Sequence, residues 1–182
     1  SDLLHTPLAH SLYLLIINEG SLKIWPWEGV CKDKVTLIYD TMHHSTQKMA
    51  ASIAEGIMSE GFEVKMYFLH EDDRSDVVTD VLDSKAICLG APTIMNKPYP
   101  SVGDIIYYLD ALNFKATGYT KKAVVFGSKG WGGGANKKMS AELEAAGFDV
   151  VDQFDTIFIP DDDVLDQCYD LGKKLAQSLK DE

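Results

Sequence analysis

The sequence predicts an α/β protein with a doubly wound, five-stranded parallel sheet and helices on both of its faces. Two observations lead to this prediction. From Val35 onward, short apolar segments typical of strands alternate five times with longer segments that are apolar on one face. Glycines stand where several of these segments end, as at Gly61 and Gly147, and glycine commonly terminates helices.

The elements in the first half of this pattern follow from their apolar residues and caps. Val35–Tyr39 is a largely apolar run typical of a buried strand, and residues 46–60 form a helix whose apolar residues recur on one face. Residues 62–69 alternate as a strand does. Residues 75–82 form a helix with its first serine as the cap.

In the second half, strands are predicted at residues 85–89 and 122–126, each closed by a glycine, and within residues 148–159. Helices are predicted at residues 101–112, 135–146 and, with an acidic start, 161–179. Because crossovers between parallel strands are right-handed, the loops after the first, third and fourth strands meet at the carboxyl edge of the sheet. The loops after the second and fifth strands are acidic and unremarkable.

The composition is that of a soluble globular protein, with 182 residues, 46% hydrophobic and 25% charged. The formal net charge of −11 argues against nucleic-acid binding, which needs a basic surface. The three cysteines, Cys31, Cys88 and Cys168, are too scattered for a disulfide framework, and Cys88 is expected in the core. A reducing, cytoplasmic compartment is therefore the default expectation. The apolar run at residues 12–17 is too short to span a bilayer and lacks the flanks of a signal peptide, so no membrane association is expected.

Residues 1–33 do not share the alternating pattern, and no helix or strand period persists among them for long. They also hold two of the three tryptophans. We therefore predict an N-terminal extension, or the remnant of an upstream domain, at residues 1–33 and a single α/β domain at residues 34–182.

The first of the three loops, Thr41–Thr46, has the composition of a phosphate site. It lies between a buried strand and a helix N-terminus, where backbone N–H groups converge and the helix dipole favours an anion. Thr41, Ser45 and Thr46 add hydroxyl donors, although such residues also cap helices for structural reasons alone. The loop has neither the lysine of a P-loop nor a Gly-x-Gly-x-x-Gly motif, so it favours a monophosphate.

Three other polar residues near this loop are assigned ordinary roles. His43 and His44 have no acidic or cysteine partner at metal-ligand spacing, so no metal site is predicted. Asp40 is expected to bond the backbone of the loop, because a carboxylate that pointed inward would repel a phosphate.

The second loop, Gly90–Pro100, is stiffened by three prolines and carries Ile94, Met95 and Tyr99 where a surface loop is normally polar. These side chains suit a flat aromatic ligand, with Asn96 and backbone groups bonding its polar edge. The alternative is a rigid connection whose apolar residues pack inward.

The third loop, Gly127–Gly134, has five glycines in eight residues around Trp131. Glycines leave the backbone exposed and allow positive φ, and a tryptophan in such a loop favours stacking on a planar ligand. The alternative is a flexible loop with the tryptophan folded back onto the domain.

A phosphate loop, an apolar loop and a glycine–tryptophan loop at one sheet edge together predict a site for a planar mononucleotide, and FMN fits best. The residues expected at the phosphate are Thr41, His43, Ser45 and Thr46. Those expected on one side of the ring are Pro92, Thr93, Ile94 and Asn96, and those on the other are Ser128, Gly130, Trp131 and Gly132. The predicted cofactor-binding set is completed by Met42, His44, Met95, Lys129 and Gly133. No residue is expected to act as a general acid or nucleophile.

Three motifs occur in the order found in one known family: Tyr39–His43, Ala91–Ile94 with Asn96, and Phe126–Gly133. Over roughly residues 31–180 the chain resembles the flavodoxin domain of flavodiiron proteins, or A-type flavoproteins, especially those of the rubredoxin:oxygen oxidoreductase type. The resemblance implies a flavodoxin-like sheet with strand order 2-1-3-4-5. It also implies an FMN that relays electrons from rubredoxin or a similar donor to a non-haem diiron centre, which reduces O2 or NO.

Family members carry that diiron centre on a preceding metallo-β-lactamase-like domain. This chain has five histidines and no His-x-His/Glu-x-Asp run, so it is not expected to perform the diiron chemistry alone. The expectation is an isolated or degenerate flavodoxin module, as a part of a longer protein or as a stand-alone one. Its expected partners are a redox protein such as rubredoxin and a diiron domain or subunit, and it is a monomer or a homodimer.

Two residues depart from the family pattern. Relatives commonly have glycine at the position of His44, so a positive φ there would carry a cost. Relatives commonly have tyrosine or methionine at the position of Lys129, and a cation beside the ring would stabilise the anionic reduced flavin and raise its potential.

Other functions remain open on the sequence. The main alternative is a stand-alone NAD(P)H-dependent FMN or quinone reductase of the same fold. A phosphoacceptor receiver domain would need a paired-acid pocket, and the first strand supplies only Asp40. A scaffold that has lost its cofactor is a further alternative.

Overall fold

The computed structural model describes residues 12–18, 21–27, 31–112, 114 and 120–180. It divides into two compact units, Ser1–Val30 and Cys31–Glu182. In the first unit, β1 (Leu12–Asn18) and β2 (Ser21–Trp27) form an antiparallel pair. The expectation that no strand pattern persists in this segment was wrong, because residues 12–17 of β1 are an unbroken apolar run and so show no alternation.

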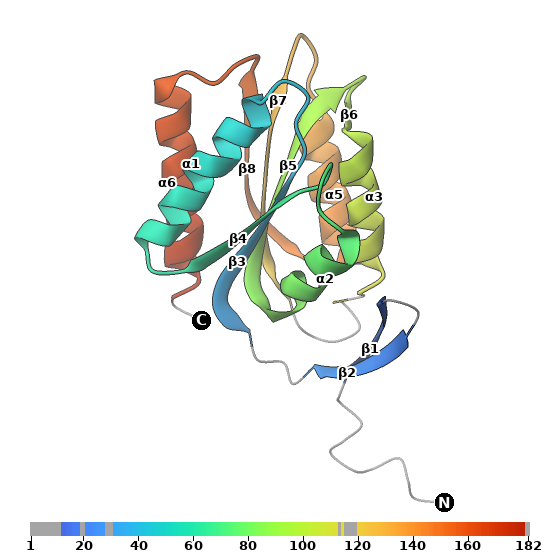
Figure 1. The fold of residues 1–182 in the computed structure, drawn as a ribbon. Helices are drawn as coiled ribbons and strands as arrows, with labels where there is room; N and C mark the ends of the chain where they lie inside the picture. The colour runs from blue at the N-terminus through green and yellow to red at the C-terminus, as the bar shows by residue number, and fades with distance from the viewer. Residues whose placement is uncertain (1–11, 19–20, 28–30, 113, 115–119, 181–182) are drawn as a thin grey trace, which may run out of the picture. The chain divides into compact units, whose positions relative to one another are not determined.

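The second unit contains a parallel sheet with the strand order β4-β3-β5-β7-β8 (Figure 1). Its strands are β3 (Lys32–Tyr39), β4 (Glu63–Phe68), β5 (Ser84–Ile94), β7 (Lys122–Lys129) and β8 (Asp149–Ile157). The short strand β6 (Lys97–Pro98) pairs antiparallel with the end of β5. Numbered along this unit, the parallel strands have the order 2-1-3-4-5, so the predicted fold class is confirmed.

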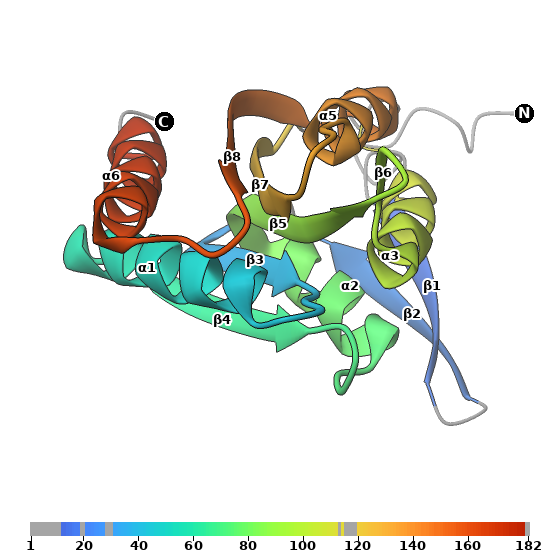
Figure 2. The same ribbon diagram turned by 90° about the horizontal axis from the view of Figure 1, so that it is seen from above.

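Helices cover both faces of this sheet (Figure 2). One face is covered by α1 (Ser45–Ser59) and α6 (Asp162–Ser178), and the other by α2 (Arg74–Asp83), α3 (Pro100–Asp110) and α5 (Ala135–Ala146). The central strands are therefore buried from both sides, and Cys88 of β5 lies in the core as predicted. Within the described residues, no helix has the length and apolar character needed to cross a bilayer.

Two central strands run further than the sequence predicts. The ladder between β5 and β7 continues through Ala91–Gly127 to Pro92–Ser128, and β6 pairs with Thr93 and Ile94. The predicted strand ends at residues 89 and 126 were therefore wrong, because glycine and proline were taken as loop residues where ladder pairing continues. As a result, much of the second and third loops is held by the sheet.

Candidate functional site

A cavity of about 500 Å³ opens at the carboxyl edge of the sheet, within the range of about 300–1,000 Å³ typical of small-molecule sites. All three predicted loops contribute to it. The predicted residues that line it are Met42, His43, Ser45, Pro92, Thr93, Ser128, Lys129 and Gly130. The connection between β8 and α6, expected to be unremarkable, adds Phe158 and Ile159. That expectation was wrong.

Asp40 holds the first loop from its β3 end. The carboxylate is only 2% exposed. Its Oδ1 accepts the backbone N–H of Thr41 at 2.7 Å, and its Oδ2 accepts the hydroxyl of Ser101 in the first turn of α3. The predicted role of Asp40 as a partner of the loop backbone is confirmed. Because both oxygens accept hydrogen bonds, Asp40 ties the first loop to the helix that follows the second.

The first loop ends at the N-terminus of α1. His44 is the N-cap and has a left-handed backbone with φ 62°, which is the costly conformation considered for this position. Its ring Nδ1 lies 2.8 Å from Oε1 of Gln47. Thr46 is fully buried, and its hydroxyl lies 3.4 Å from that of Ser128, which brings the first and third loops together.

The helices that follow the three central strands begin differently from those at the sheet edges. At the edges, Asp73 accepts the N–H of Ser75 at 2.7 Å, and Asp161 accepts the N–H of Val164 at 3.0 Å. The hydrogen bond from the Ser75 N–H lowers the pKa of Asp73. The central helices, whose N-caps are His44, Tyr99 and Gly134, have neither a side-chain cap from the described residues nor an acid in the first turn. At α1 and α5 the N–H groups of the first turn are therefore open to an anionic ligand, whereas α3 begins with Pro100, which has no N–H.

The tip of the second loop is a tight turn between β5 and β6. Met95 and Asn96 have positive φ angles of 48° and 60°, and Met95 is 89% exposed. Asn96 approaches the glycine loop so closely that a Cβ at Gly132 would lie 2.7 Å from its Oδ1. Only glycine fits there without a shift, so the second and third loops are built against each other.

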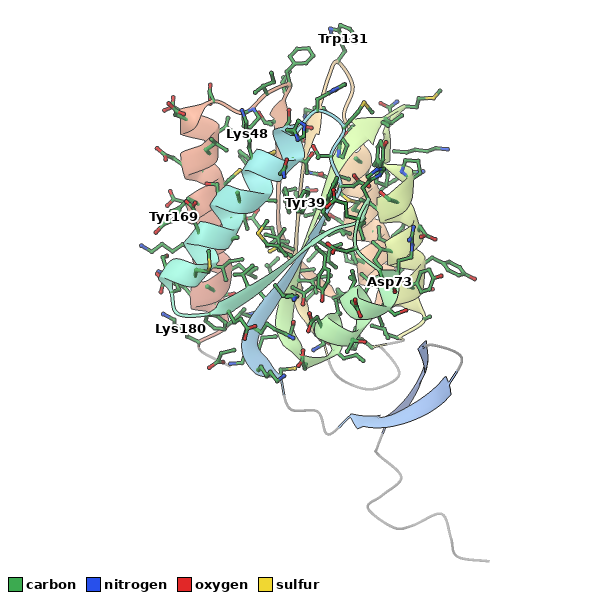
Figure 3. All side chains as sticks on the ribbon, in the orientation of Figure 1. Tyr39, Lys48, Asp73, Trp131, Tyr169 and Lys180 are labelled. Carbon is green, nitrogen blue, oxygen red and sulfur yellow. The ribbon has the colours of Figure 1, made fainter. Side chains whose placement is uncertain are left out.

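An aromatic pair stands beside the cavity. Trp131, at the tip of the third loop, is fully exposed (Figure 3) and lies edge-on to Phe158, with ring centroids 6.2 Å apart. Phe158 has φ 59°, and its N–H donates to the carbonyl of Lys129 at 2.8 Å. All four described non-glycine residues with positive φ, which are His44, Met95, Asn96 and Phe158, lie in connections at this sheet edge. Such strain gathers at functional sites.

Lys129 lines the cavity, but its charge is not isolated. The Nζ atom lies 2.7 Å from Oδ1 of Asp155 on β8, and both side chains are partly exposed. The sequence did not predict this partner, because Asp155 belongs to a strand far along the chain whose pairing with β7 sets the contact.

Six predicted site residues lie in the same connections, or at their ends, but do not line the cavity: Thr41, His44, Thr46, Ile94, Met95 and Asn96. The same holds for Trp131, Gly132 and Gly133 of the third loop. Within the described part of the chain, no group of three or more His, Cys, Asp or Glu side chains is arranged to hold a metal ion.

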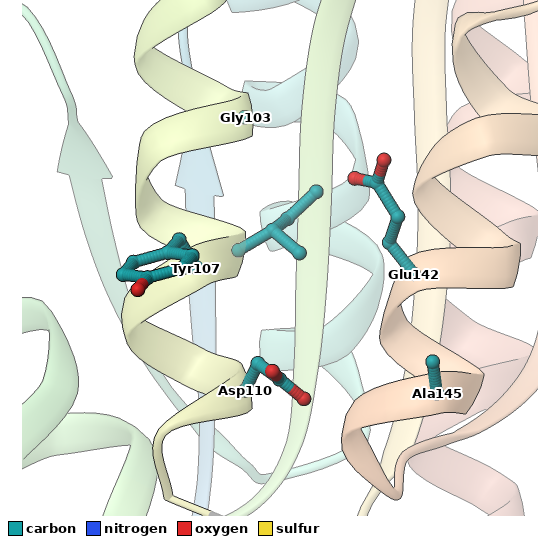
Figure 4. Close-up of a pocket in the computed structure, with 6 residues that line it drawn as sticks. Gly103, Tyr107, Asp110, Glu142 and Ala145 are labelled. Atoms are coloured by element: carbon teal, nitrogen blue, oxygen red, sulfur yellow. The ribbon is translucent and has the colours of Figure 1, made fainter.

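A second hollow, of about 270 Å³, lies between α3 and α5 (Figure 4). Tyr107, Asp110 and Glu142 line it, together with three smaller or apolar residues. None of the loop residues contributes to it, and its two carboxylates would repel a phosphate. The cavity at the carboxyl edge is the candidate site, because residues of all three predicted loops line it.

The profile of the flavodoxin family matches residues 37–172. The chain belongs to the flavodoxin family. Coenzyme F420H(2) oxidase of Methanocaldococcus jannaschii is 53% identical over 150 residues, covering 82% of this chain and 36% of that protein. Nitric oxide reductase of Moorella thermoacetica is 38% identical over 156 residues, covering 85% and 38%.

Solved structures of related proteins have the same fold. The rubredoxin oxygen:oxidoreductase of Desulfovibrio gigas superposes with a TM-score of 0.77 at 29% identity, covering 85% of this chain and 38% of that one. A flavodoxin from the domain Archaea gives a TM-score of 0.72 at 25% identity, covering 81% of this chain and 99% of the flavodoxin. The predicted likeness to the flavodoxin domain of flavodiiron proteins is confirmed. The chain spans little more than a third of the curated relatives' length.

This membership implies FMN as the cofactor, as predicted. The residues present fit it. An N-terminus of α1 without a side-chain cap, with Ser45 of its first turn in the cavity wall, suits a phosphate. Apolar walls beside it, from Pro92, Phe158 and Ile159, suit a planar ring.

Proposed function

We propose that this chain is an FMN-binding electron-transfer module. Bound FMN supplies one- and two-electron redox chemistry, and the protein supplies binding, orientation and electrostatics. One observation carries the proposal. The uncapped N-terminus of α1 borders the same cavity as residues of the second and third loops. Electrons come from rubredoxin or a similar donor and pass to a diiron centre held by a separate domain or subunit, in line with the names of two solved neighbours, a rubredoxin oxygen:oxidoreductase and a flavodiiron protein.

In this proposal the residues divide by chemistry. The first-turn N–H groups of α1 and the hydroxyl of Ser45 hold the phosphate, and the buried Thr46 hydroxyl, 3.4 Å from that of Ser128, links this loop to the third. The ring is held between Pro92–Thr93 on one side and Ser128–Gly130 on the other. Phe158, which lines the cavity and lies edge-on to Trp131, keeps water from one side of it.

The rim of the cavity is the docking surface for the redox partner in this proposal. Five large apolar side chains are exposed there: Met42, Met95, Trp131, Phe158 and Ile159. A patch of this kind on a chain of net charge −11 is typical of an interaction site. Lys97 is exposed on β6 and adds a positive charge at the same sheet edge.

Two further assignments belong to the proposal. Residues 34–182 form the FMN module, and residues 1–33 belong to an extension or an upstream domain. The three cysteines are free, which suits a reducing, cytoplasmic compartment.

The test is a titration of flavin-free protein with FMN and with riboflavin, followed by flavin fluorescence. Because the phosphate supplies charge-assisted hydrogen bonds, we expect FMN to bind at least about a hundredfold more tightly than riboflavin. Equal affinities, or no binding, would contradict the proposal. Rapid reduction of the bound flavin by NADPH without a partner would favour a reductase instead.

The partner surface is tested separately by stopped-flow reduction of the FMN-loaded protein by rubredoxin. Trp131→Ala should slow this reaction, because it removes the most exposed apolar group of the rim. Tyr107→Ala is the matched control, since Tyr107 is 78% exposed but lies on α3 beside the second hollow. Equal rates for the two variants would place the docking surface elsewhere.

A further inference from the structure

The Lys129–Asp155 pair joins the cavity wall to the strand behind it. Lys129 is the last residue of β7 and lines the cavity, whereas Asp155 lies on β8 and does not. Their charged atoms are 2.7 Å apart. The side chain of Lys129 also runs beside the glycine loop, because a Cβ at Gly133 would lie 3.2 Å from its Cδ and 3.4 Å from its Nζ.

The position of this ammonium group therefore depends on two neighbours. Asp155 attracts it toward β8, and the backbone at Gly133 limits its movement toward the third loop. The Lys129 side chain is 26% exposed and that of Asp155 is 37% exposed, so their attraction is stronger than that of a fully solvated pair. A lysine side chain without this partner would sample many rotamers.

The charge at this position bears on flavin chemistry. When oxidised FMN takes up two electrons and one proton, it becomes the anionic reduced form, with a net gain of one negative charge. A cation in the cavity wall stabilises this form more than the oxidised form and so raises the potential. An acid paired with that cation reduces the effect.

We propose that Asp155 is a positioning residue that sets the reduction potential of bound FMN through Lys129. It holds the ammonium group at the β8 side of the cavity wall and offsets part of its charge, which keeps the potential below the value that an unpaired Lys129 would give. The inference rests on the proposed FMN function and assigns the tuning of that site to a residue outside the cavity.

The experiment is a double-mutant cycle with the FMN-loaded protein, in which dithionite supplies the electrons and a reference dye reports the potential. The potential gives the ratio of the dissociation constants for oxidised and reduced FMN. Asp155→Asn should raise this ratio by up to about tenfold, which is about 30 mV for a two-electron couple. Lys129→Met should lower it, and the double variant should match Lys129→Met within error.

Controls separate this coupling from a general charge effect. Asp152→Asn removes an exposed acid from the same strand, and Lys138→Met removes an exposed lysine from α5, so both should leave the potential nearly unchanged. Lys129→Arg keeps the charge and should keep most of the wild-type potential. Thermal unfolding of each flavin-free variant checks that the fold is intact.

Each outcome decides between explanations. If Asp155→Asn raises the potential equally in the Lys129→Met background, Asp155 acts as an independent charge and the inference is wrong. If Asp155→Asn changes nothing, the pair is structural only and the inference is again wrong. Failure of the wild-type protein to bind FMN would instead overturn the proposed function, and the inference with it.

Discussion

The helices that follow the central strands and those that follow the edge strands begin in chemically opposite ways. At the edges, α2 and α6 are capped by Asp73 and Asp161 and carry further acids in their first turns. In the centre, α1, α3 and α5 have no side-chain cap from the described residues and no acid in the first turn. Each edge helix has an aspartate that accepts one of its first N–H groups, whereas the central helices have no such acceptor among the described residues, and the N-terminus of α1 borders the cavity.

This difference shows that helices following strands of the same sheet have two roles, stabilising the fold at the edges and leaving donors for a ligand in the centre. Aspartate caps stabilise a helix, since they satisfy free N–H groups and interact favourably with the dipole. The same carboxylate at a central N-terminus would occupy the donors that an anionic ligand needs and would repel its phosphate. The central helices therefore lack a stabilising feature that the edge helices have, which is the expected pattern where a site forgoes stability for binding.

The largest effect on FMN affinity is expected when an acidic residue, typical of the edge helices, is placed in the first turn of a central helix. Ser45→Asp places a carboxylate in the first turn of α1 at the cavity wall. We expect FMN affinity to fall by at least about a hundredfold, or about 2.8 kcal/mol, because the carboxylate repels the phosphate. Riboflavin, which has no phosphate, should lose much less. Fluorescence titration with both flavins measures this.

The matched control for this variant is Ser75→Asp, which adds the same charge to the first turn of an edge helix. FMN affinity should stay within about twofold of wild type, since surface charges away from a site contribute little. If Ser45→Asp lost FMN and riboflavin equally, the first loop would not be the phosphate site.

The next largest effect is expected for Asp40, the buried carboxylate of the central region. Asp40→Ala leaves the Thr41 N–H and the Ser101 hydroxyl without their buried acceptor. We expect the free energy of unfolding in urea to fall by about 2 kcal/mol, and FMN affinity to fall as well. Asp72→Ala is the edge counterpart, because Asp72 accepts the N–H of Phe68 at 2.6 Å. It should reduce stability but not FMN affinity, and a loss of FMN there would contradict the division between centre and edge.

The sequence predicts most of the central region because its signals are local. Hydroxyls, prolines and glycines directly follow predicted strands, so the parallel topology alone brings the three loops together. What the sequence misses depends on tertiary neighbours. Phe158 and Ile159 directly follow β8, an edge strand, and only the pairing of β8 with β7 brings them to the cavity. Asp155 reaches Lys129 for the same reason.

A smaller effect is expected at an edge helix. Asp161→Ala removes the side chain that accepts the Val164 N–H at the start of α6. We expect a loss of about 1 kcal/mol in the free energy of unfolding, the usual cost of removing an N-cap, with unchanged FMN affinity. Asp161→Asn, which keeps a capping oxygen, should recover most of the stability. A change in FMN affinity in either variant would show that the edge and central regions are not independent.

The smallest effect concerns backbone strain at the N-cap of α1. His44 has φ 62°, a conformation that glycine adopts without the Cβ clash. His44→Gly removes this cost but adds chain entropy to the unfolded state and removes the contact with Gln47, so we expect a gain of only about 0.5 kcal/mol in stability. His43→Gly is the control, because His43 is not among the residues with positive φ and should only lose stability. FMN affinity of the His44→Gly variant should be retained, since its backbone N–H groups keep their positions. A loss of affinity would mean that the histidine side chain itself contributes to the phosphate site, and that the open N-terminus of α1 does not bind the anion through backbone groups alone.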